Sequence, residues 1–252
     1  MIIYTSGTTG LPKGVMLTHR NLVAMLRLME ANEAFSSDDT MICVVPMYHL
    51  YGLHIVVNLG LSEGATIVTV PRYDLDQFLQ VLEKYRVTVA PLVPPLVLTL
   101  PQAPQVDQHD LSVLRLIHCG AAMLAEKIAQ DCSRRLDCEI RYGYGMTEVS
   151  PLSHASLPDP KSHKPGSVGF CLPNTECKIV DYNNGAELGA NEEGALYKKQ
   201  EKKERGNVAS QFVIHLNVSH SSCPRDKRVP LSVISSVFPV PALSGSLACA
   251  SS

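Results

Sequence analysis

A segment near the amino end combines the residue types that hold phosphate groups. It reads Tyr4-Thr-Ser-Gly-Thr-Thr-Gly-Leu-Pro-Lys-Gly-Val15 and follows a short apolar run. Glycines let the backbone approach a phosphate closely, amides and hydroxyls donate to phosphate oxygens, and Lys13 adds a positive charge. The segment therefore predicts a loop wrapped around phosphate. A bare Gly-Thr-rich loop would more often be a flexible surface turn, which is the alternative interpretation, but the full string is far more specific.

The segment does not match the P-loop of nucleotide triphosphatases. Counted from Gly7, Pro12 stands where that motif has its second glycine, and Gly14 replaces the Ser or Thr after the lysine. A P-loop NTPase is therefore the weaker alternative for this site.

The elements that must position this loop alternate along the first 194 residues. Apolar, β-rich runs predict strands at residues 2–4 (buried), 41–45, 65–70, 87–92, 114–118 and 139–142, with further β structure at 176–181 and 194–198. Helical spacing predicts one helix that starts after an N-cap at Thr18. It predicts two further helices, at residues 74–85 and 125–136. This alternation predicts an α/β fold with a parallel or mixed sheet covered by helices.

Composition excludes several classes of protein. The 252 residues are 45% hydrophobic and 18% charged with a net charge of -2, which is typical of a globular domain and not of a polyanion-binding protein. We therefore expect no nucleic-acid partner. The longest apolar runs are broken by prolines, and the first residues lack a signal-peptide pattern, so neither a transmembrane segment nor a leader is expected. Eight cysteines occur without a C-x-x-C pair, which favours buried thiols in a reducing, intracellular setting.

The last part of the chain differs from the rest. A dense charge run at residues 198–205 precedes a serine-rich, proline-interrupted segment without clear periodicity. The sequence therefore predicts a domain over residues 1–194 and a separate tail over 195–252. The tail is expected to be poorly ordered, and a small β module is the alternative.

Three further blocks follow the phosphate-loop segment. They read Pro46-Met-Tyr-His-Leu-Tyr-Gly-Leu53, His118-Cys-Gly-Ala-Ala122 and Tyr142-Gly-Tyr-Gly-Met-Thr-Glu148. In kind and order the four blocks resemble the signatures of the adenylate-forming (AMP-binding) superfamily, and most closely its 4-coumarate–CoA ligase-like acyl-CoA synthetases. The resemblance implies a partial large N-terminal domain of the adenylate-forming fold, with mixed or parallel sheets and covering helices.

The resemblance also implies the chemistry and the residues that perform it. A carboxylate attacks the α-phosphate of ATP to give an acyl-adenylate, and coenzyme A then displaces AMP. ATP phosphates would be held by Thr5, Ser6, Gly7, Thr8, Thr9, Gly10 and Lys13. Thr147 would donate to the α-phosphate, and Glu148 would help to bind Mg²⁺. Tyr144 would lie against adenine, beside the small residues Gly120, Ala121 and Ala122, where nucleotide and acyl chain pass close to the backbone.

The acid pocket is expected at the second and fourth blocks. His49 matches the family position that orients the carboxylate, although a lone histidine there would more often be structural. Pocket walls would include Tyr48, Gly120, Gly145, Pro151 and Leu152, and core packing is an equal alternative for the last two. Tyr and His walls favour a hydroxycinnamate-like aromatic acid, and a fatty acid is the alternative. Histidines 109, 118, 154 and 163 show no metal-ligand spacing, so they are expected to be structural or exposed.

Several family features are missing from the sequence. The phosphate loop starts at residue 5, and after Gly194-Ala-Leu196 the ribose-binding aspartate, the hinge and the small domain with its catalytic lysine are absent. The resemblance thus implies a chain truncated at both ends, with impaired activity. A non-catalytic nucleotide-binding fragment, or a regulator of an intact ligase, is the alternative function. Related ligases occur in the cytosol and the peroxisome.

Overall fold

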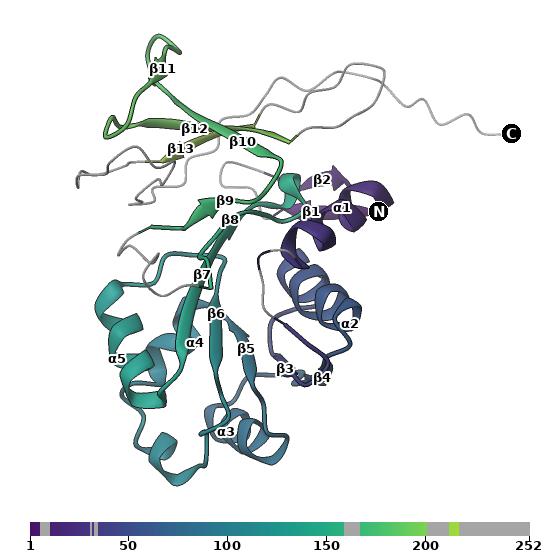
Figure 1. Cartoon of the computed structure of the whole chain (residues 1–252), viewed down its shortest axis with the longest axis vertical. Helices are drawn as coiled ribbons and strands as arrows, with labels where there is room; N and C mark the ends of the chain where they lie inside the picture. The colour runs from purple at the N-terminus through teal and green to yellow at the C-terminus, as the bar shows by residue number, and fades with distance from the viewer. Residues whose placement is uncertain (6–10, 31, 33–34, 159–166, 201–211, 217–252) are drawn as a thin grey trace, which may run out of the picture.

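The computed structural model describes residues 1–5, 11–30, 32, 35–158, 167–200 and 212–216. In these residues the strands form three sheets: a two-stranded hairpin, a seven-stranded sheet and a four-stranded sheet. Figure 1 shows the seven-stranded sheet at the centre of the molecule, with the hairpin beside one end of it and the four-stranded sheet above.

The seven-stranded sheet carries five of the segments that were predicted as strands. Its strands are β3 (Thr40–Cys43), β4 (Thr66–Thr69), β5 (Val89–Leu92), β6 (Leu116–Cys119), β7 (Glu139–Gly145), β8 (Leu152–Ala155) and β9 (Phe170–Cys171), in the order β4-β3-β5-β6-β7-β8-β9. β3 to β7 pair in parallel, and β8 and β9 add to the edge in antiparallel orientation. The predicted mixed α/β fold is confirmed, whereas β8 and β9 were not predicted.

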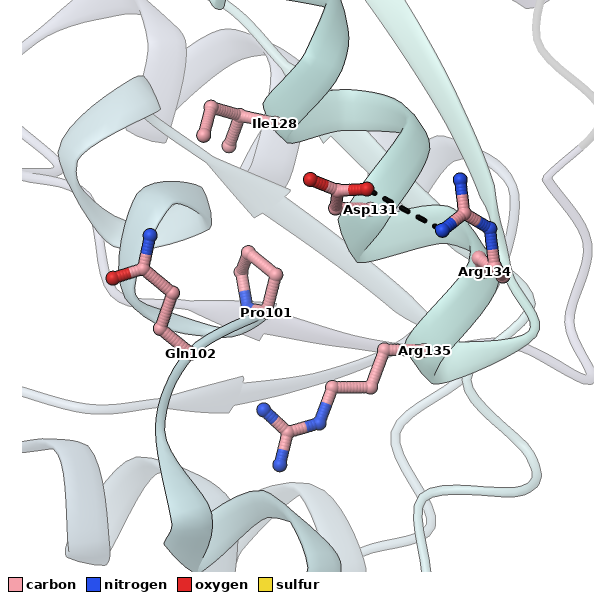
Figure 2. A pocket seen from close by; sticks show the side chains of 6 residues that line it. All are labelled: Pro101, Gln102, Ile128, Asp131, Arg134 and Arg135. Atoms are coloured by element: carbon pink, nitrogen blue, oxygen red, sulfur yellow. Dashed lines mark ion pairs between the residues drawn. The ribbon is translucent and has the colours of Figure 1, made fainter.

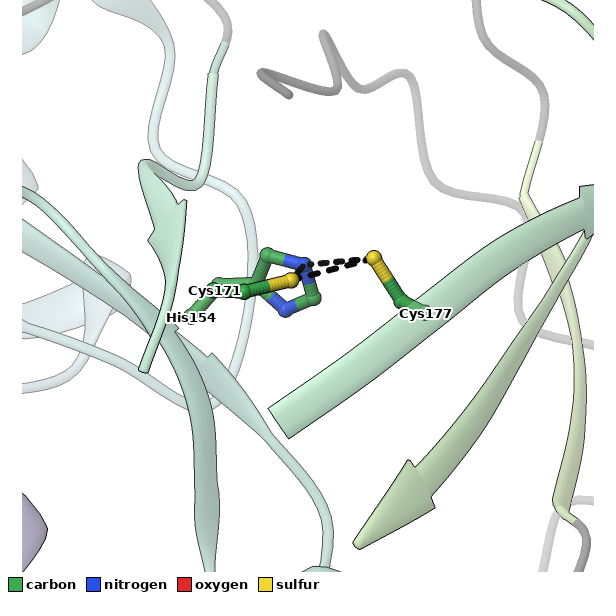
Figure 3. A group of neighbouring side chains, drawn as sticks. All are labelled: His154, Cys171 and Cys177. Carbon is green, nitrogen blue, oxygen red and sulfur yellow. Dashed lines mark hydrogen bonds between the residues drawn. The ribbon is translucent and has the colours of Figure 1, made fainter. Parts of the chain in front are cut away.

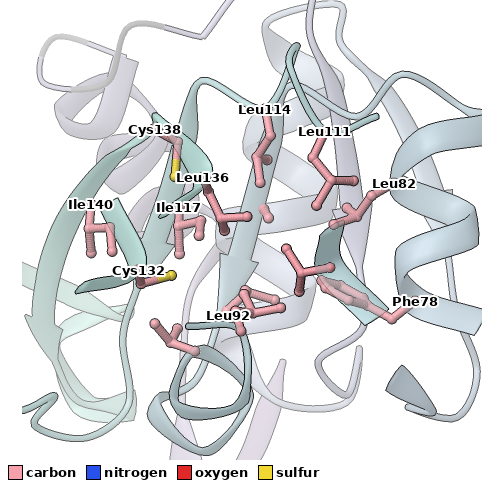
Figure 4. Packing of buried hydrophobic residues seen from close by; sticks show 14 of the residues in the cluster. Phe78, Leu82, Leu92, Leu111, Leu114, Ile117, Cys132, Leu136, Cys138 and Ile140 are labelled. Atoms are coloured by element: carbon pink, nitrogen blue, oxygen red, sulfur yellow. The ribbon is translucent and has the colours of Figure 1, made fainter. Parts of the chain in front are cut away.

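Helices cover both faces of this sheet, which explains the apolar strands. On one face, α3 (Leu75–Lys84), α4 (Pro94–Thr99), the 3₁₀ turn η2 (Pro104–Gln108) and α5 (Glu126–Leu136) pack on the cluster shown in Figure 4. On the other face lie α1 (His19–Glu30), the π-helix η1 (Tyr51–Asn58) and α2 (Leu59–Ser62). Successive residues of β3 alternate between the faces: Met41 and Cys43 join one cluster and Ile42 the other. A strand buried on both sides needs apolar residues at every position.

The predicted N-cap at Thr18 is confirmed, and Asp74 caps a second helix that was predicted without a named cap. The Thr18 hydroxyl accepts a hydrogen bond from the Asn21 amide at 3.1 Å, and the Asp74 carboxylate accepts one from the Gln77 amide at 3.0 Å. The sequence patterns did not predict η1, because its buried residues leave little polar–apolar contrast around the helix.

The first strand differs from the prediction. Among the described strands, β1 (Ile2–Thr5) pairs only with β2 (Lys13–Met16), in an antiparallel hairpin with Thr5 opposite Lys13. Ile2 is 61% exposed and Tyr4 71% exposed, so the expectation of a buried strand was wrong. The apolar sequence of this strand reflects its β-propensity and not burial in this chain.

The remaining strands form the antiparallel sheet β11-β10-β12-β13. They are β10 (Thr175–Val180), β11 (Glu187–Leu188), β12 (Gly194–Gln200) and β13 (Phe212–Leu216). The predicted domain boundary at residue 194 coincides with the first residue of β12, and β13 lies inside the predicted tail. The division into residues 1–194 and 195–252 stays a prediction, since most of the tail lies outside the described residues.

A buried carboxylate ties three parallel strands together at their amino ends. Asp39, 4% exposed, precedes β3 and accepts hydrogen bonds from Arg115 Nε at 2.9 Å, Arg115 Nη2 at 2.7 Å and the Thr88 hydroxyl at 2.6 Å. Burial alone would raise the pKa of Asp39, but the bonds from Arg115, Thr88 and the Ser36 amide outweigh it and lower the pKa. Asp39 therefore stabilises the fold in its charged form.

Replacing Arg115 should show how much stability is lost when the buried Asp39 carboxylate has no cationic partner. We expect Arg115→Ala to lower the free energy of unfolding by about 2–3 kcal/mol at pH 7, because Asp39 keeps its burial but loses two charge-assisted bonds. The pKa of Asp39 is lower in the folded chain than in the unfolded chain, where it is about 3.9. Asp39 therefore contributes its full stabilisation above about pH 3.9, and this contribution is lost as the pH falls through the pKa of the folded chain. The difference between variant and parent should therefore shrink in acid. Urea unfolding at neutral and acidic pH measures both effects.

Arg86→Ala is the matched control. Arg86 pairs with Asp110 at 2.9 Å, but both side chains are more than half exposed. An exposed pair contributes less than about 1 kcal/mol. Equal losses in the two variants would contradict the assigned role of the buried carboxylate.

Candidate active site

The predicted site blocks follow the carboxyl ends of the parallel strands. Residues 46–53 come after β3, residues 120–122 after β6, and the fourth block runs along β7 into the 3₁₀ turn η3 (Thr147–Val149). The chain leaves β3 toward β4 and leaves β5 toward β6, so the strand order reverses between β3 and β5. In open α/β sheets, ligands bind in the crevice outside the carboxyl ends at such a reversal.

The hairpin brings the ends of the phosphate-loop segment close to the fourth block. Residues 6–10, which include the predicted Ser6, Gly7, Thr8, Thr9 and Gly10, lie outside the described residues. Their flanking residues Thr5 and Lys13 face each other across the hairpin, and Lys13 is exposed. β2 and η3 have Cα atoms within 8 Å of one another. The described end of the Gly-Thr-rich segment, at β2, therefore lies beside the turn that carries Thr147 and Glu148.

The backbone of Gly145 lies unusually close to that of Pro151. A Cβ atom on Gly145 would lie 1.8 Å from the Pro151 carbonyl oxygen, a distance that no side chain can adopt. The same carbonyl accepts a hydrogen bond from the Met146 amide at 2.7 Å. This contact closes the loop that holds Thr147, which is buried, and Glu148, which is half-buried. Gly145 thus shapes the turn that presents both predicted catalytic side chains.

His49 and Tyr48 lie in the turn that leads into η1, and both are exposed. His49 Nδ1 accepts a hydrogen bond from the Tyr51 amide at 3.1 Å, so in the neutral ring Nε2 carries the proton. Partial desolvation of the ring lowers the pKa of His49, which favours this neutral form at pH 7. The geometry leaves an Nε2–H that can donate to a carboxylate oxygen.

Tyr51 joins the second and third blocks, a role that the sequence did not assign. Its buried hydroxyl donates to the His118 carbonyl at 2.6 Å and lies 3.1 Å from the Leu92 carbonyl. It thereby anchors the start of η1 to the carboxyl ends of β5 and β6. In the sequence, Tyr51 could be noticed only as an aromatic residue two positions after His49. The carbonyl groups that it binds are seen only in the folded chain.

The third block is held between Tyr51 and β7. A Cβ atom on Gly120 would lie 3.4 Å from the Tyr51 ring, and one on Gly143 would lie 2.9 Å from the His118 ring. Gly120 is buried, whereas Ala121 and Ala122 are exposed. Ala121 has a positive φ of 71°, a conformation that side chains larger than glycine rarely adopt. The structure thus links the second, third and fourth blocks by direct packing.

The remaining predicted residues lie on β7 and β8. Tyr144 is half-buried, and its ring meets the His154 ring edge-on with centroids 5.9 Å apart. Burial raises the pKa of Tyr144, so its hydroxyl stays neutral. Pro151 and Leu152 are both buried, and Leu152 packs in the same core cluster as Ala155. For Leu152 this placement favours the core-packing alternative.

A pocket elsewhere on the surface contains none of these residues. Figure 2 shows it between α5 and the chain after α4, lined by Pro101, Gln102, Ile128, Asp131, Arg134 and Arg135. Its arginines are paired with aspartates: Arg134 with Asp131 at 3.5 Å and Arg135 with Asp107 at 2.9 Å. Among the helices of the described residues, none has the length and apolar character needed to cross a membrane.

Comparison with known proteins gives the class to which this fold and these blocks belong. The family model described as AMP-binding enzyme matches residues 1–206. The chain belongs to the AMP-binding enzyme family. Solved structures similar to this chain include adenylate-forming acyl-CoA synthetases.

Individual relatives agree with this assignment. The 4-coumarate–CoA ligase 1 of Petroselinum crispum is 39% identical over 201 residues, which are 77% of this chain and 37% of that protein. The 4-coumarate–CoA ligase 5 of Oryza sativa subsp. japonica is 40% identical over the same shares. The chain thus spans about 37% of the length of these curated relatives.

Solved structures agree with the fold. Apo MatB from Rhodopseudomonas palustris superposes with a TM-score of 0.72 at 31% identity, covering 79% of this chain and 38% of that one. The ATP-bound form of MatB superposes with a TM-score of 0.76 at 26% identity, covering 91% and 47%.

Because the Gly145 backbone lies so close to Pro151, adding one methyl group at Gly145 should destabilise the fold. We expect Gly145→Ala to lower the free energy of unfolding by about 1–3 kcal/mol, because the new Cβ must push the Pro151 backbone away. Urea unfolding followed by circular dichroism measures the loss. Gly189→Ala is the control, since its Cβ would meet only the flexible Glu192 carboxylate at 3.3 Å. That variant should stay within about 0.5 kcal/mol of the parent. A Gly145→Ala chain as stable as the control would show that the turn is not fixed by this contact.

Proposed function

We propose that this chain binds ATP and activates a carboxylic acid as an acyl-adenylate, which coenzyme A then converts to an acyl-CoA thioester. The observation that carries the proposal is the position of β2 beside η3. Lys13 is the first residue of β2, and β2 has Cα atoms within 8 Å of η3, the turn that carries Thr147 and Glu148. Cationic and hydroxyl donors would then surround the phosphate chain from two sides, where charge develops during attack on the α-phosphorus.

The donor set suits a triphosphate and its metal ion. Lys13 is an exposed ammonium group at the end of a glycine-rich segment, and Thr147 offers a hydroxyl on the turn that lies beside β2. Glu148 would hold Mg²⁺, which proteins commonly bind through one or two carboxylates together with substrate phosphates. Bound Mg²⁺ would neutralise phosphate charge; this chain's own residues orient the phosphates and exclude water.

His49 would act at the acid end of the site. Its neutral ring and its Nε2–H are suited to hold a carboxylate oxygen without removing the charge that makes the carboxylate nucleophilic. Gly120, Ala121 and Ala122 would let the ligand pass close to the backbone, and Tyr144 would offer its ring to adenine. Tyr48 and Gly145 would border the acid, and coenzyme A would enter as the second co-substrate.

The acid we propose is aromatic and similar to 4-coumarate. The names of the relatives at 39–40% identity support this choice. A fatty acid is the second possibility, supported by the long-chain-fatty-acid–CoA ligase FadD1 of Archaeoglobus fulgidus at 27% identity. For the compartment we propose the cytosol or the peroxisome, as for related ligases.

A non-catalytic role is the second candidate function. The Gly-Thr-rich segment, Lys13 and Thr147 could hold a nucleotide in this role as well. In that case the chain would bind nucleotide without turnover, or would regulate an intact ligase.

Variants at the two sides of the proposed phosphate site test the binding step. We expect Lys13→Ala and Thr147→Ala each to weaken Mg·ATP binding about tenfold to a hundredfold, because each removes one donor to a charged oxygen. Isothermal titration calorimetry measures the affinity. Lys127→Ala is the matched control, because Lys127 is an exposed lysine on α5 and outside the site. If all three variants bind like the parent, the phosphate site is misplaced.

Turnover separates the two candidate functions. The chain is incubated with Mg·ATP and a panel of 4-coumarate, benzoate and a medium-chain fatty acid, and acyl-adenylate is detected by mass spectrometry. Adenylate from one acid supports the proposed activity and identifies its substrate. ATP binding without any adenylate supports the non-catalytic alternative, and hydrolysis to ADP alone would contradict both.

A further inference from the structure

His154, Cys171 and Cys177 converge where the two larger sheets meet. Figure 3 shows the three side chains pointing toward one another, His154 from β8, Cys171 from β9 and Cys177 from β10. Cys171 Sγ lies 3.1 Å from His154 Nε2 and 3.0 Å from Cys177 Sγ, and Cys177 Sγ lies 3.7 Å from His154 Nε2. These ligand atoms all lie within 4.8 Å of one another.

The histidine is oriented as a ligand by its second nitrogen. The Ser153 hydroxyl donates to the Tyr144 carbonyl at 3.1 Å, so its oxygen is left to accept from His154 Nδ1 at 3.0 Å. The proton therefore sits on Nδ1, and the lone pair of Nε2 faces the two sulfur atoms. Metal-binding histidines are held in this way by a hydrogen bond to the nitrogen that does not bind the metal.

From this geometry we propose that His154, Cys171 and Cys177 form a Zn²⁺ site. Imidazole and thiolate are the ligands that zinc prefers, and three protein ligands leave a fourth position for water. Zinc–ligand bonds of about 2.0–2.3 Å at tetrahedral angles place sulfur and nitrogen roughly 3.6 Å apart and two sulfurs roughly 3.8 Å apart. The Cys177 Sγ–His154 Nε2 distance of 3.7 Å already lies near this value. Cys171 Sγ must move away by roughly 0.5 Å from His154 Nε2 and by roughly 0.8 Å from Cys177 Sγ when zinc binds.

The neighbourhood of the cluster suits a bound ion. His154 is 0% exposed, whereas Cys171 and Cys177 are half-buried, so solvent reaches the sulfur side. Neither cysteine forms a disulfide, and four other cysteines (Cys43, Cys119, Cys132 and Cys138) are buried. Binding converts both thiols to thiolates and releases two protons to solvent, so zinc affinity should fall as the pH falls. The ion would join β8 and β9 of one sheet to β10 of the other.

The site makes no use of the proposed nucleotide chemistry, so its test is independent of that function. The reduced chain is equilibrated with Zn²⁺, and bound zinc is measured by elemental analysis and by competition with a chromophoric chelator. We expect one equivalent per chain in the parent and none in Cys171→Ser or Cys177→Ser. Ser153→Ala, which removes only the group that orients His154, should weaken binding about tenfold to a hundredfold. The double variant Cys223→Ser/Cys249→Ser is the matched control and should bind zinc like the parent.

A second measurement uses the unmodified chain, so it holds even if a variant fails to fold. Cysteines are alkylated with and without Zn²⁺, and the labelled peptides are identified by mass spectrometry. Zinc should protect Cys171 and Cys177, and Co²⁺ in its place should give thiolate-to-metal charge-transfer and intense tetrahedral d–d bands. Equal labelling of Cys171 and Cys177 with and without zinc would overturn the proposal. Zinc binding at the parent's level in both Cys171→Ser and Cys177→Ser would overturn it as well.

Discussion

The backbone contact between Gly145 and Pro151 constrains the whole candidate site. No side chain fits between them, so β7 can continue past Tyr144 directly against the start of β8. The turn η3 is the short connection that this contact leaves between the two strands. Its position beside β2 then decides whether Thr147 and Glu148 can face the phosphate-loop segment. One missing Cβ atom thus determines where two side chains of the fourth block lie.

The other blocks reach this turn through a chain of packed side chains. Tyr51 binds the carbonyl of His118, and the His118 ring packs on Gly143, two residues before Gly145. Each contact needs a small residue or a buried polar partner, which explains why the predicted site is rich in both. At the opposite end of the same strands, Asp39 fixes β3, β5 and β6 through charged hydrogen bonds. The sheet is therefore held at its amino ends by electrostatics and at its carboxyl ends by close packing.

The sequence predicted those features that depend on local chemistry. Strands buried on both faces have continuous apolar runs, Thr18 caps its helix as expected, and four blocks in order resembled the family to which the chain belongs. It misjudged features that depend on partners far away in the chain. The strand at residues 2–4 is apolar but pairs only within a hairpin, and η1 is buried on too many sides to show amphipathic spacing. Tyr51 was overlooked because its hydroxyl bonds to carbonyls 41 and 67 residues away.

The cysteine–histidine cluster shows the same limit and connects to the candidate site. His154 and Cys171 are 17 residues apart and Cys171 and Cys177 are 6 apart, a spacing that matches no familiar ligand motif. Only the pairing of β8 with β9, and the path of β10 out of that sheet, bring them together. His154 is also the direct cross-strand partner of Tyr144 on β7, and their rings touch edge-on. Cross-strand neighbours constrain each other's rotamers. An ion that fixes the His154 ring would therefore also restrict the Tyr144 ring, the residue proposed to face adenine.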